Sequence, residues 1–123
     1  MVRVLTVDDH ESFRRAALAL VTATDGFEDA GSASTAEDAI RAVDRLQPDL
    51  VLMDVRLPGM DGCEASRRIT ERHPDVVVIL ISAAEEVLGG SNAESCAAVA
   101  LLGKEDLRPS VLREVWEAHR RDG

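Results

Sequence analysis

The chain has 123 residues, which suits one compact domain, and its apolar share of 46% is too high for a disordered chain. The net charge of −9 disfavours a general nucleic-acid binder, because an acidic surface repels phosphate backbones. The sequence opens with no signal peptide and contains no apolar run long enough to span a bilayer, so we expect a cytoplasmic protein without membrane contact.

Short apolar runs along the chain are typical of strands. Three of them, at 2–7, 49–53 and 76–81, are rich in Val, Leu and Ile, as buried parallel strands are. Weaker signals indicate a second strand around 27–30 and a fifth strand at 99–102.

Segments with helical spacing separate these runs. A first helix is expected around 13–21. The second begins with a capping box formed by Ser34 and Glu37 and stops before Pro48. A third helix is expected over about 61–72, where a His-Pro pair ends it.

Two more helices are expected in the last third of the chain. The fourth falls within 85–98 and is interrupted by Gly89 and Gly90. The fifth runs over about 106–121, and its expected apolar face carries Leu107, Val111, Val115 and Ala118. The alternation of strands and helices predicts a single α/β domain, residues 1–123, with a parallel sheet between two layers of helices.

The chain has two cysteines, Cys63 and Cys96. Both fall in sequence that indicates a helix or a helix edge, and nothing suggests a secreted disulfide framework. We therefore expect both to be reduced and to pack as small apolar residues.

Residues that carry chemistry stand at the ends of the predicted strands. Asp8 and Asp9 follow the first strand, Asp54 the third, Ser82 the fourth and Lys104 the fifth. Sites in open α/β sheets form at the carboxyl ends of strands. Clustered carboxylates need a cation, and hard oxygen ligands favour Mg²⁺. One carboxylate could then attack phosphorus to form an acyl phosphate, with metal and lysine neutralising the phosphoryl oxygens.

Each of these residues also has a plainer interpretation. An Asp at a strand end often caps a helix or lies in a solvated turn, and Ser82 could cap a helix in the same way. Lys104 could be an ordinary surface charge. His10, next to the acids, is expected to pack or to lie in the first helical turn and not to bind metal.

Two strings identify a family. VLTVDDH at 4–10 and DLVLMDVRLPGMDG at 49–62 resemble the response-regulator receivers of two-component signalling, most closely the NarL/FixJ (LuxR-type) subfamily. The resemblance covers essentially the whole chain. It implies the flavodoxin-like (βα)5 fold, a doubly wound parallel five-stranded sheet whose strand order, 2-1-3-4-5, is carried over from the family.

The resemblance also implies roles for the acids. Asp54 matches the phosphoacceptor. Asp9 and Asp54 match direct Mg²⁺ ligands, Asp8 acts through a water, and the backbone carbonyl of Arg56 completes the protein ligands. The side chain of Arg56 is expected over the mouth of the pocket.

Further roles are implied on the phosphoryl side of the pocket. Ser82 matches the hydroxyl that bonds the phosphoryl group, the small Ala83 leaves access, and Lys104 matches the lysine that pairs with the phosphoryl oxygens. Leu101 stands where the family commonly has an aromatic residue that rotates inward on activation, so this rotation cannot occur in its usual form. The glycine usual before the fifth strand is replaced by Ala97 or Ala100. We expect Ser82 to move and the change to pass to 85–98.

The implied function is a phosphorylation-dependent switch that accepts a phosphoryl group from a sensor histidine kinase. It would catalyse only its own phosphorylation and dephosphorylation, and so would not be an enzyme acting on a free substrate. NarL-like receivers usually precede a DNA-binding domain, which would account for a transcriptional output by residues absent from this chain. The kinase, the signal and the output are not encoded in any motif.

Three alternatives or additions remain open at this stage. A degenerate receiver would be an interaction module that works without phosphorylation. An aspartyl phosphatase would need an acid two residues after its nucleophile, where this chain has Arg56. Homodimerisation through the fourth and fifth helices and the fifth strand would make Trp116 a contact, unless Trp116 covers the edge of the core.

Overall fold

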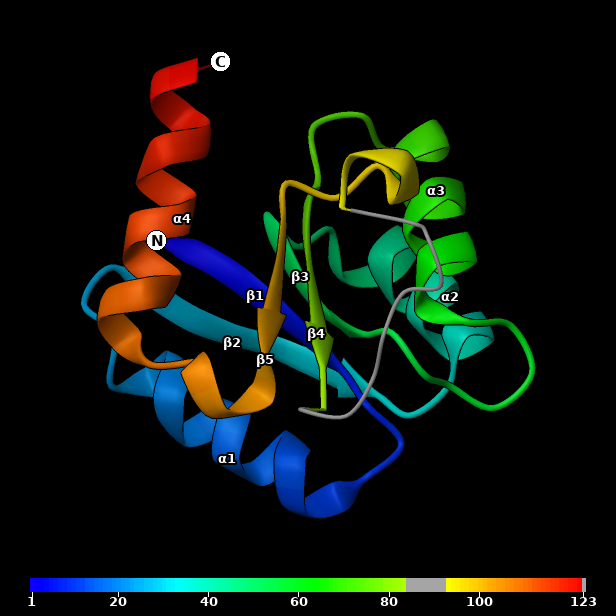
Figure 1. Cartoon of the computed structure of the whole chain (residues 1–123), viewed down its shortest axis with the longest axis horizontal. Helices are drawn as coiled ribbons and strands as arrows, with labels where there is room; N and C mark the ends of the chain where they lie inside the picture. The colour runs from blue at the N-terminus through cyan, green and yellow to red at the C-terminus, as the bar shows by residue number, and fades with distance from the viewer. Residues whose placement is uncertain (84–92, 123) are drawn as a thin grey trace.

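The computed structural model describes residues 1–83 and 93–122 and contains one parallel five-stranded sheet (Figure 1). The strand order β2-β1-β3-β4-β5 confirms the flavodoxin-like fold. The strands are β1 (Val2–Val7), β2 (Phe27–Ala33), β3 (Leu50–Asp54), β4 (Val77–Ser82) and β5 (Ala100–Gly103). The helices are α1 (Glu11–Thr22), α2 (Ala36–Leu46), α3 (Gly62–Arg72) and α4 (Pro109–Asp122), with short 3₁₀ turns η1 (Glu94–Cys96) and η2 (Lys104–Asp106).

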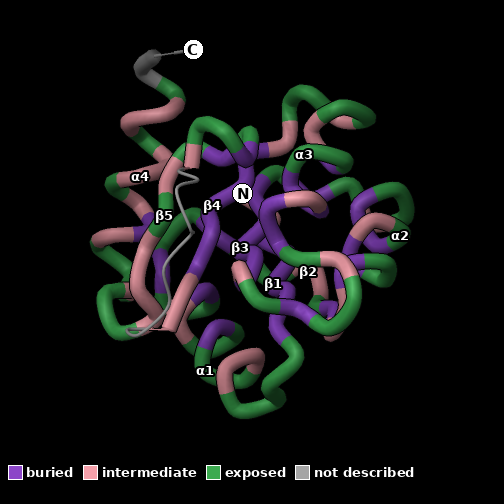
Figure 2. Tube along the Cα trace, turned by 45° about the vertical axis from the view of Figure 1, so that its right-hand side comes forward, coloured by how far each residue is buried: buried purple, intermediate pink, exposed green. Residues whose placement is uncertain are grey.

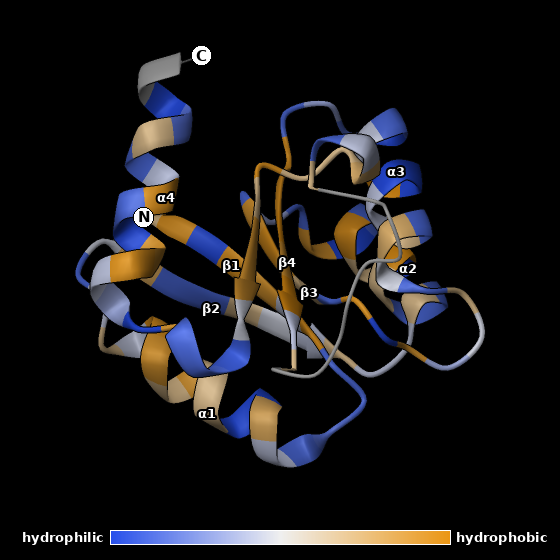
Figure 3. Cartoon of the chain, in the orientation of Figure 1, coloured by the Kyte–Doolittle hydropathy of each residue, from blue (hydrophilic) through white to orange (hydrophobic). Residues whose placement is uncertain are grey.

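Helices cover both faces of the sheet, because its strands β3 and β4 are apolar on both sides (Figures 1 and 3). One buried cluster joins α2, α3 and η1 to the sheet and includes Met53. The other joins α1 and α4 to the opposite face and includes Leu52. Every residue of the central strand β3 is buried (Figure 2), so the end of this strand is held firmly in place.

Strand β2 is longer than the sequence signal indicated and contains a register shift. Val4 of β1 lies opposite Asp29, whereas Leu5 lies opposite Gly31. Gly31 has φ +141°, and a Cβ there would lie 3.0 Å from Cδ1 of Leu46. A glycine at this bulge therefore lets α2 pack closely on the sheet.

The start of α2 corrects the predicted cap by one residue. Thr35, not Ser34, is the N-cap, and its hydroxyl accepts a hydrogen bond from the backbone N–H of Asp38. Thr35 has the extended backbone that an N-cap requires, so the predicted capping box is wrong. The helix ends before Pro48, as expected, with Gln47 in the left-handed conformation.

The last helix uses a different buried residue from those predicted. Leu112 is completely buried, whereas the predicted Val111 is only half-buried. The helix begins at Pro109, after the separate turn η2, and the predicted Leu107 and Val115 pack against the same cluster as Leu112. Trp116 packs edge-on against Phe27, with ring centroids 6.5 Å apart, as expected of a residue covering the core edge.

Most of the predicted fourth helix, including Gly89 and Gly90, lies outside the described residues. The described part of 85–98 contains η1, and Ala97 after it has φ +60°. Ala97 is one of the two alanines expected to replace the family's glycine, and it adopts the left-handed backbone that favours glycine.

The two cysteines form a disulfide, so the prediction that they are reduced is wrong. Cys63 lies in the first turn of α3 and Cys96 in η1, and their Cα atoms are 4.8 Å apart. The pair is separated by 33 positions in sequence, and only the packing of η1 against α3 brings the sulfurs together. None of the helices in the described part of the chain is long and apolar enough to cross a bilayer.

Leu112→Ala tests the packing of α4. We expect it to lower the free energy of unfolding by about 2–5 kcal/mol, because it leaves a cavity in the core. Leu18→Ala on the exposed side of α1 is the matched control and should cost less than about 1 kcal/mol. Urea unfolding of both variants measures the difference, and equal effects would contradict the packing of α4.

Candidate functional site

The acidic residues predicted from the sequence converge at one end of the sheet. Asp8 and Asp9 follow β1, and Asp54 is the last residue of the neighbouring strand β3. Asp8, Asp9, His10 and Asp54 each offer one ligand atom, and these four atoms lie within 4.8 Å of one another. The predicted convergence of the three carboxylates is confirmed.

Two of these carboxylates have almost no contact with water. Asp8 is fully buried and Asp54 is 3% exposed, whereas Asp9 is open to solvent. The ammonium of Lys104 lies 2.8 Å from Oδ2 of Asp8 and 3.7 Å from Oδ2 of Asp54. It also lies over the ring of Phe13, 4.7 Å from the ring centroid, and this cation–π contact helps to hold the ammonium in place.

The pKa values of the two buried carboxyl groups are shifted in opposite directions. Burial raises the pKa of Asp54 to about 6, and the nearby charge of Asp8 adds to the shift. Burial acts in the same direction on Asp8, but hydrogen bonds from Lys104 and His10 outweigh it and lower the pKa of that carboxyl. Asp54 is therefore the carboxylate whose charge the protein leaves least compensated.

His10 contacts the acids directly. It is the N-cap residue of α1, directly before the first turn in which it was expected. Its ring is exposed, so the packing alternative is wrong, and Nδ1 lies 3.0 Å from Oδ1 of Asp8 and 3.1 Å from Oδ1 of Asp9. His10 thereby orients two carboxylates at the rim of the site.

The backbone after β3 is shaped around the Asp54 side chain. The N–H of Arg56 donates to Oδ1 of Asp54 at 3.1 Å, a contact that sequence reasoning missed. The N–H of Gly62 donates to the carbonyl of Val55 at 2.8 Å, and a Cβ on Gly62 would lie 2.0 Å from the carbonyl oxygen of Asp54. Only glycine fits there, so the start of α3 lies directly against the strand that carries Asp54.

The remaining predicted residues lie at the end of β4 and on β5. Ser82 ends β4 opposite Gly103 of β5, and Ala83 follows it; both are half-buried. Leu101 lies on β5 with 40% of its surface exposed. The contacts of Ser82 and Ala83 with a phosphoryl group, and the carbonyl of Arg56 as a ligand, remain predictions.

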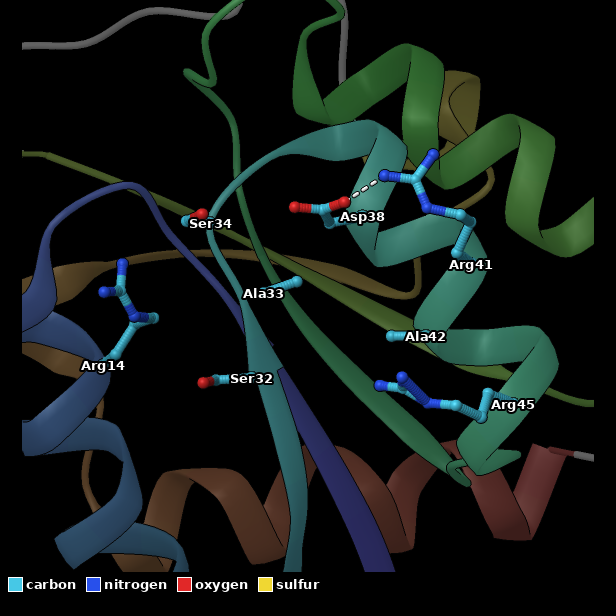
Figure 4. Close-up of a pocket in the computed structure, with 8 residues that line it drawn as sticks. All are labelled: Arg14, Ser32, Ala33, Ser34, Asp38, Arg41, Ala42 and Arg45. Atoms are coloured by element: carbon cyan, nitrogen blue, oxygen red, sulfur yellow. Dashed lines mark hydrogen bonds and ion pairs between the residues drawn. The ribbon is translucent and has the colours of Figure 1, made fainter.

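Arg14 is a further residue that sequence reasoning missed. Its Nη1 donates to the backbone carbonyl of Asp8 at 2.7 Å and so holds the end of β1. Arg14 also borders a hollow of about 380 Å³ beside β2, opposite Arg41 and Arg45 of α2 (Figure 4). Asp38 faces Arg41 there and pairs with it, so the hollow is mainly basic and is distinct from the acidic site.

The acidic cluster has the composition of a divalent cation site. Three carboxylates supply hard oxygen atoms, and one side of the cluster is open through Asp9. Hard oxygen donors that leave room for water are the ligands Mg²⁺ prefers. A cation bound there would relieve the repulsion between Asp8 and Asp54, so the residues present fit the metal.

A family model described as the response regulator receiver domain matches residues 4–115. The response regulator GacA of Pseudomonas viridiflava is 40% identical over 86 residues, which cover 70% of this chain and 40% of GacA. A protein-glutamate methylesterase/protein-glutamine glutaminase of Geobacter metallireducens is 43% identical over 105 residues, 83% of this chain and 30% of that protein. The chain thus spans less than half the length of these relatives.

The solved structures show the same arrangement of elements. The signal receiver domain of the response regulator NarL from Mycobacterium tuberculosis superimposes with a TM-score of 0.81 at 26% identity. The match covers 97% of this chain and 96% of that domain.

Asp54→Asn tests the buried charge in protein stripped of divalent cations. At pH near 7.5 we expect the variant to be more stable than the wild type by about 1–3 kcal/mol, because a buried charge is removed. The folded-state pKa of Asp54, about 6, exceeds the ordinary 3.8, so the unfolded chain releases its proton first. The wild type therefore loses stability as the pH rises from about 4 to about 6, and the variant lacks this loss.

Urea unfolding of both proteins across this pH range measures the effect, with Asp75→Asn at an exposed position as the control. A difference between wild type and Asp54→Asn that does not change with pH would contradict the assigned environment of Asp54.

Proposed function

The chain belongs to the response regulator receiver family, and from this membership and its acidic site we propose that it is a phosphorylation-dependent signalling switch. In this proposal Asp54 accepts a phosphoryl group from a sensor histidine kinase of a two-component system. The observation that carries it is the position of Asp54, a buried carboxylate with raised pKa that lies beside two acids and within 3.7 Å of the Lys104 ammonium.

The proposed magnesium ligands are the residues around the open side of the cluster. Asp9, Asp54 and the backbone carbonyl of Arg56 would hold the ion directly, and Asp8 would hold it through a water. When bound, Mg²⁺ supplies the positive charge that lets the carboxylates ionise together and that neutralises phosphoryl oxygens.

The chemical step needs a nucleophile and a fixed positive charge. An oxygen of the Asp54 carboxylate attacks the phosphorus of the kinase phosphohistidine; a P–O bond forms as the P–N bond breaks, and the imidazole nitrogen keeps the electron pair and takes a proton. Lys104, which stands between Asp8 and Asp54 before transfer, then pairs with a phosphoryl oxygen. Ser82 donates its hydroxyl to another oxygen, and Ala83 leaves room for the group.

The reaction is one the domain performs on itself. It forms and hydrolyses its own acyl phosphate, and no free substrate turns over. The methylesterase activity in the name of the Geobacter relative is said of that protein, of which this chain matches 30%.

We place residues 1–123 as one receiver domain of a NarL/FixJ-type transcriptional regulator that acts in the cytoplasm. Two of the similar proteins support this proposal: the response regulator GacA and the receiver domain of the response regulator NarL. A domain with a net charge of −9 is poorly suited to DNA, so DNA binding would belong to a part of the protein outside these residues.

A second copy of the chain is the proposed partner for the face made by β5 and α4, the region expected to hold the fifth strand and the fifth helix. Val99 and Leu101 expose 41% and 40% of their surfaces there. A hollow of about 670 Å³ beside them is lined by Ala98, Val99 and Val115. Exposed apolar residues around a hollow are typical of an interface.

Phosphorylation is tested directly with a small phosphodonor. Incubation of the protein with Mg²⁺ and acetyl phosphate should add one phosphoryl group, seen as an increase of intact mass, because Asp54 is a buried carboxylate with a raised pKa that lies farther from Lys104 than Asp8 does. Asp54→Asn should remove the gain, and omission of Mg²⁺ should do the same.

Lys104→Met helps to distinguish the phosphorylation-dependent switch from the degenerate interaction module. It should slow labelling while Mg²⁺ still raises the thermal stability of the variant. Absence of labelling under conditions that label a known receiver, together with no stabilisation by Mg²⁺, would replace the switch by the degenerate interaction module.

A further inference from the structure

The Cys63–Cys96 disulfide lies close to the proposed phosphoacceptor. Cys63 follows Gly62, whose backbone packs against Asp54 and donates a hydrogen bond to the carbonyl of Val55. Cys96 lies in η1, on the other side of the sulfur–sulfur bond. The bond therefore ties η1 to the turn of α3 that touches the strand end carrying Asp54.

The surroundings of Cys63 are those of a reactive sulfur. Cys63 lies in the first turn of α3, where backbone N–H groups favour negative charge. Nη1 of Arg67, one turn later, donates to Sγ of Cys63 at 3.1 Å. A helix N-terminus and a guanidinium both favour the thiolate form of a cysteine, which is the form that leaves and attacks in disulfide exchange.

The two sulfurs differ in access. Cys63 is 9% exposed, whereas Cys96 is completely buried. Cys63 is therefore the more accessible of the two residues and the one that we expect an external thiolate to attack. Arg67 also donates to the carbonyl of Ser95 at 3.2 Å, so the same guanidinium holds the residue before Cys96 near Cys63. This second bond would keep the cysteines aligned after reduction and so favour closure of the disulfide again.

We propose that Cys63 and Cys96 form a reversible thiol–disulfide site that reacts with dithiol reductants and with glutathione disulfide as oxidant. In reduction, a thiolate of the dithiol attacks Sγ of Cys63; a new S–S bond forms, and Cys96 leaves and takes a proton. The second thiol of the reductant attacks the sulfur of the reductant in this mixed disulfide, which releases Cys63 as a thiolate beside Arg67. The dithiol is oxidised by two electrons and the protein is reduced by two.

In oxidation, the Cys63 thiolate attacks glutathione disulfide and releases one glutathione. Cys96, after loss of its proton, then attacks Sγ of Cys63 and releases the second glutathione. Disulfides in reducing compartments are usually transient or redox-sensing, which agrees with the proposed cytoplasmic location.

Reduction removes the covalent tie between α3 and η1. The two thiols can then separate by rotation of their side chains or by a movement of η1. The turn of α3 that follows Gly62, which packs against the backbone of Asp54, is then no longer covalently held to η1.

The consequence for signalling rests on the proposed function. The disulfide joins η1 to the turn of α3 that follows Gly62, and Gly62 packs directly against the backbone of Asp54. A rearrangement of that turn on phosphorylation of Asp54 is thereby opposed by a covalent bond to η1. We expect the reduced protein to accept the phosphoryl group faster than the oxidised protein.

The exchange site is tested by alkylation and mass measurement of the native protein. The isolated oxidised protein should take up no iodoacetamide, should take up two groups after dithiothreitol, and should take up none after reoxidation with glutathione disulfide. In single-cysteine proteins at neutral pH, Cys63 in Cys96→Ser should react at least about threefold faster than Cys96 in Cys63→Ser. Reduction that occurs only in denaturant, or equal rates for the two cysteines, would overturn the proposal.

Arg67→Gln and Arg68→Gln form a matched pair for the role of the guanidinium. Both arginines lie on α3 and pair with Glu64, but only Arg67 contacts the sulfur. In the Cys96→Ser background, Arg67→Gln should slow alkylation of Cys63 by at least about threefold, whereas Arg68→Gln should leave it unchanged. Equal effects of the two variants would show that Arg67 does not activate the sulfur.

The link to the switch is tested by labelling with acetyl phosphate and Mg²⁺. The reduced protein and the Cys63→Ser/Cys96→Ser variant should be labelled at least about fivefold faster than the oxidised protein, a coupling at the lower end of the usual range. Equal rates would refute the link. No labelling in either redox state would refute the link and the proposed phosphorylation together, whereas the alkylation results decide the thiol–disulfide site alone.

Discussion

Two buried carboxylates share one ammonium ion, and the rest of the site is arranged around this imbalance. Lys104 stands close to Asp8 and farther from Asp54, at 2.8 Å and 3.7 Å. A single positive charge cannot compensate two desolvated negative charges equally, so the pKa of Asp8 falls while that of Asp54 rises to about 6. Asp54 is thus the carboxylate that gains most from an additional positive charge nearby. A divalent cation bound by the cluster supplies such a charge.

The fold makes such an arrangement possible without strain on the acids themselves. Strands β1 and β3 are neighbours in the centre of the sheet, so parallel direction brings Asp8 and Asp54 to the same end. Apolar clusters on both faces hold these strands, and the loops are then fixed by polar bonds, from Arg14 to the carbonyl of Asp8 and from the N–H of Arg56 to Asp54. Buried carboxylates of this kind lower stability, and the core around β3 compensates for that cost.

Local patterns were sufficient to predict the three most apolar strands and the position of the acids, but not the full length of β2 or its register shift. Apolar runs mark buried strands, and a residue directly after a strand must lie at its carboxyl end. The disulfide could not be predicted, because it depends on how η1 packs against α3 and not on either local sequence. The same limit applies to Leu112, whose burial depends on where α4 begins, and to the N-cap at Thr35, which competes with an adjacent serine. Arg14 was missed because its partner is a backbone carbonyl, which leaves no pattern in the sequence.

The site and the output side of the domain differ in how far they follow the family. Every side chain that the proposed chemistry needs is present, whereas the aromatic of the usual relay is replaced by Leu101, which lies exposed on β5. A relay without that rotating ring must use contacts that already touch the strand ends. The described residues offer one such path, from Asp54 through the packed backbone of Gly62 to the first turn of α3. A bond from that turn to η1 would then act on the relay itself, since it ties the first turn of α3 to a second segment of the chain.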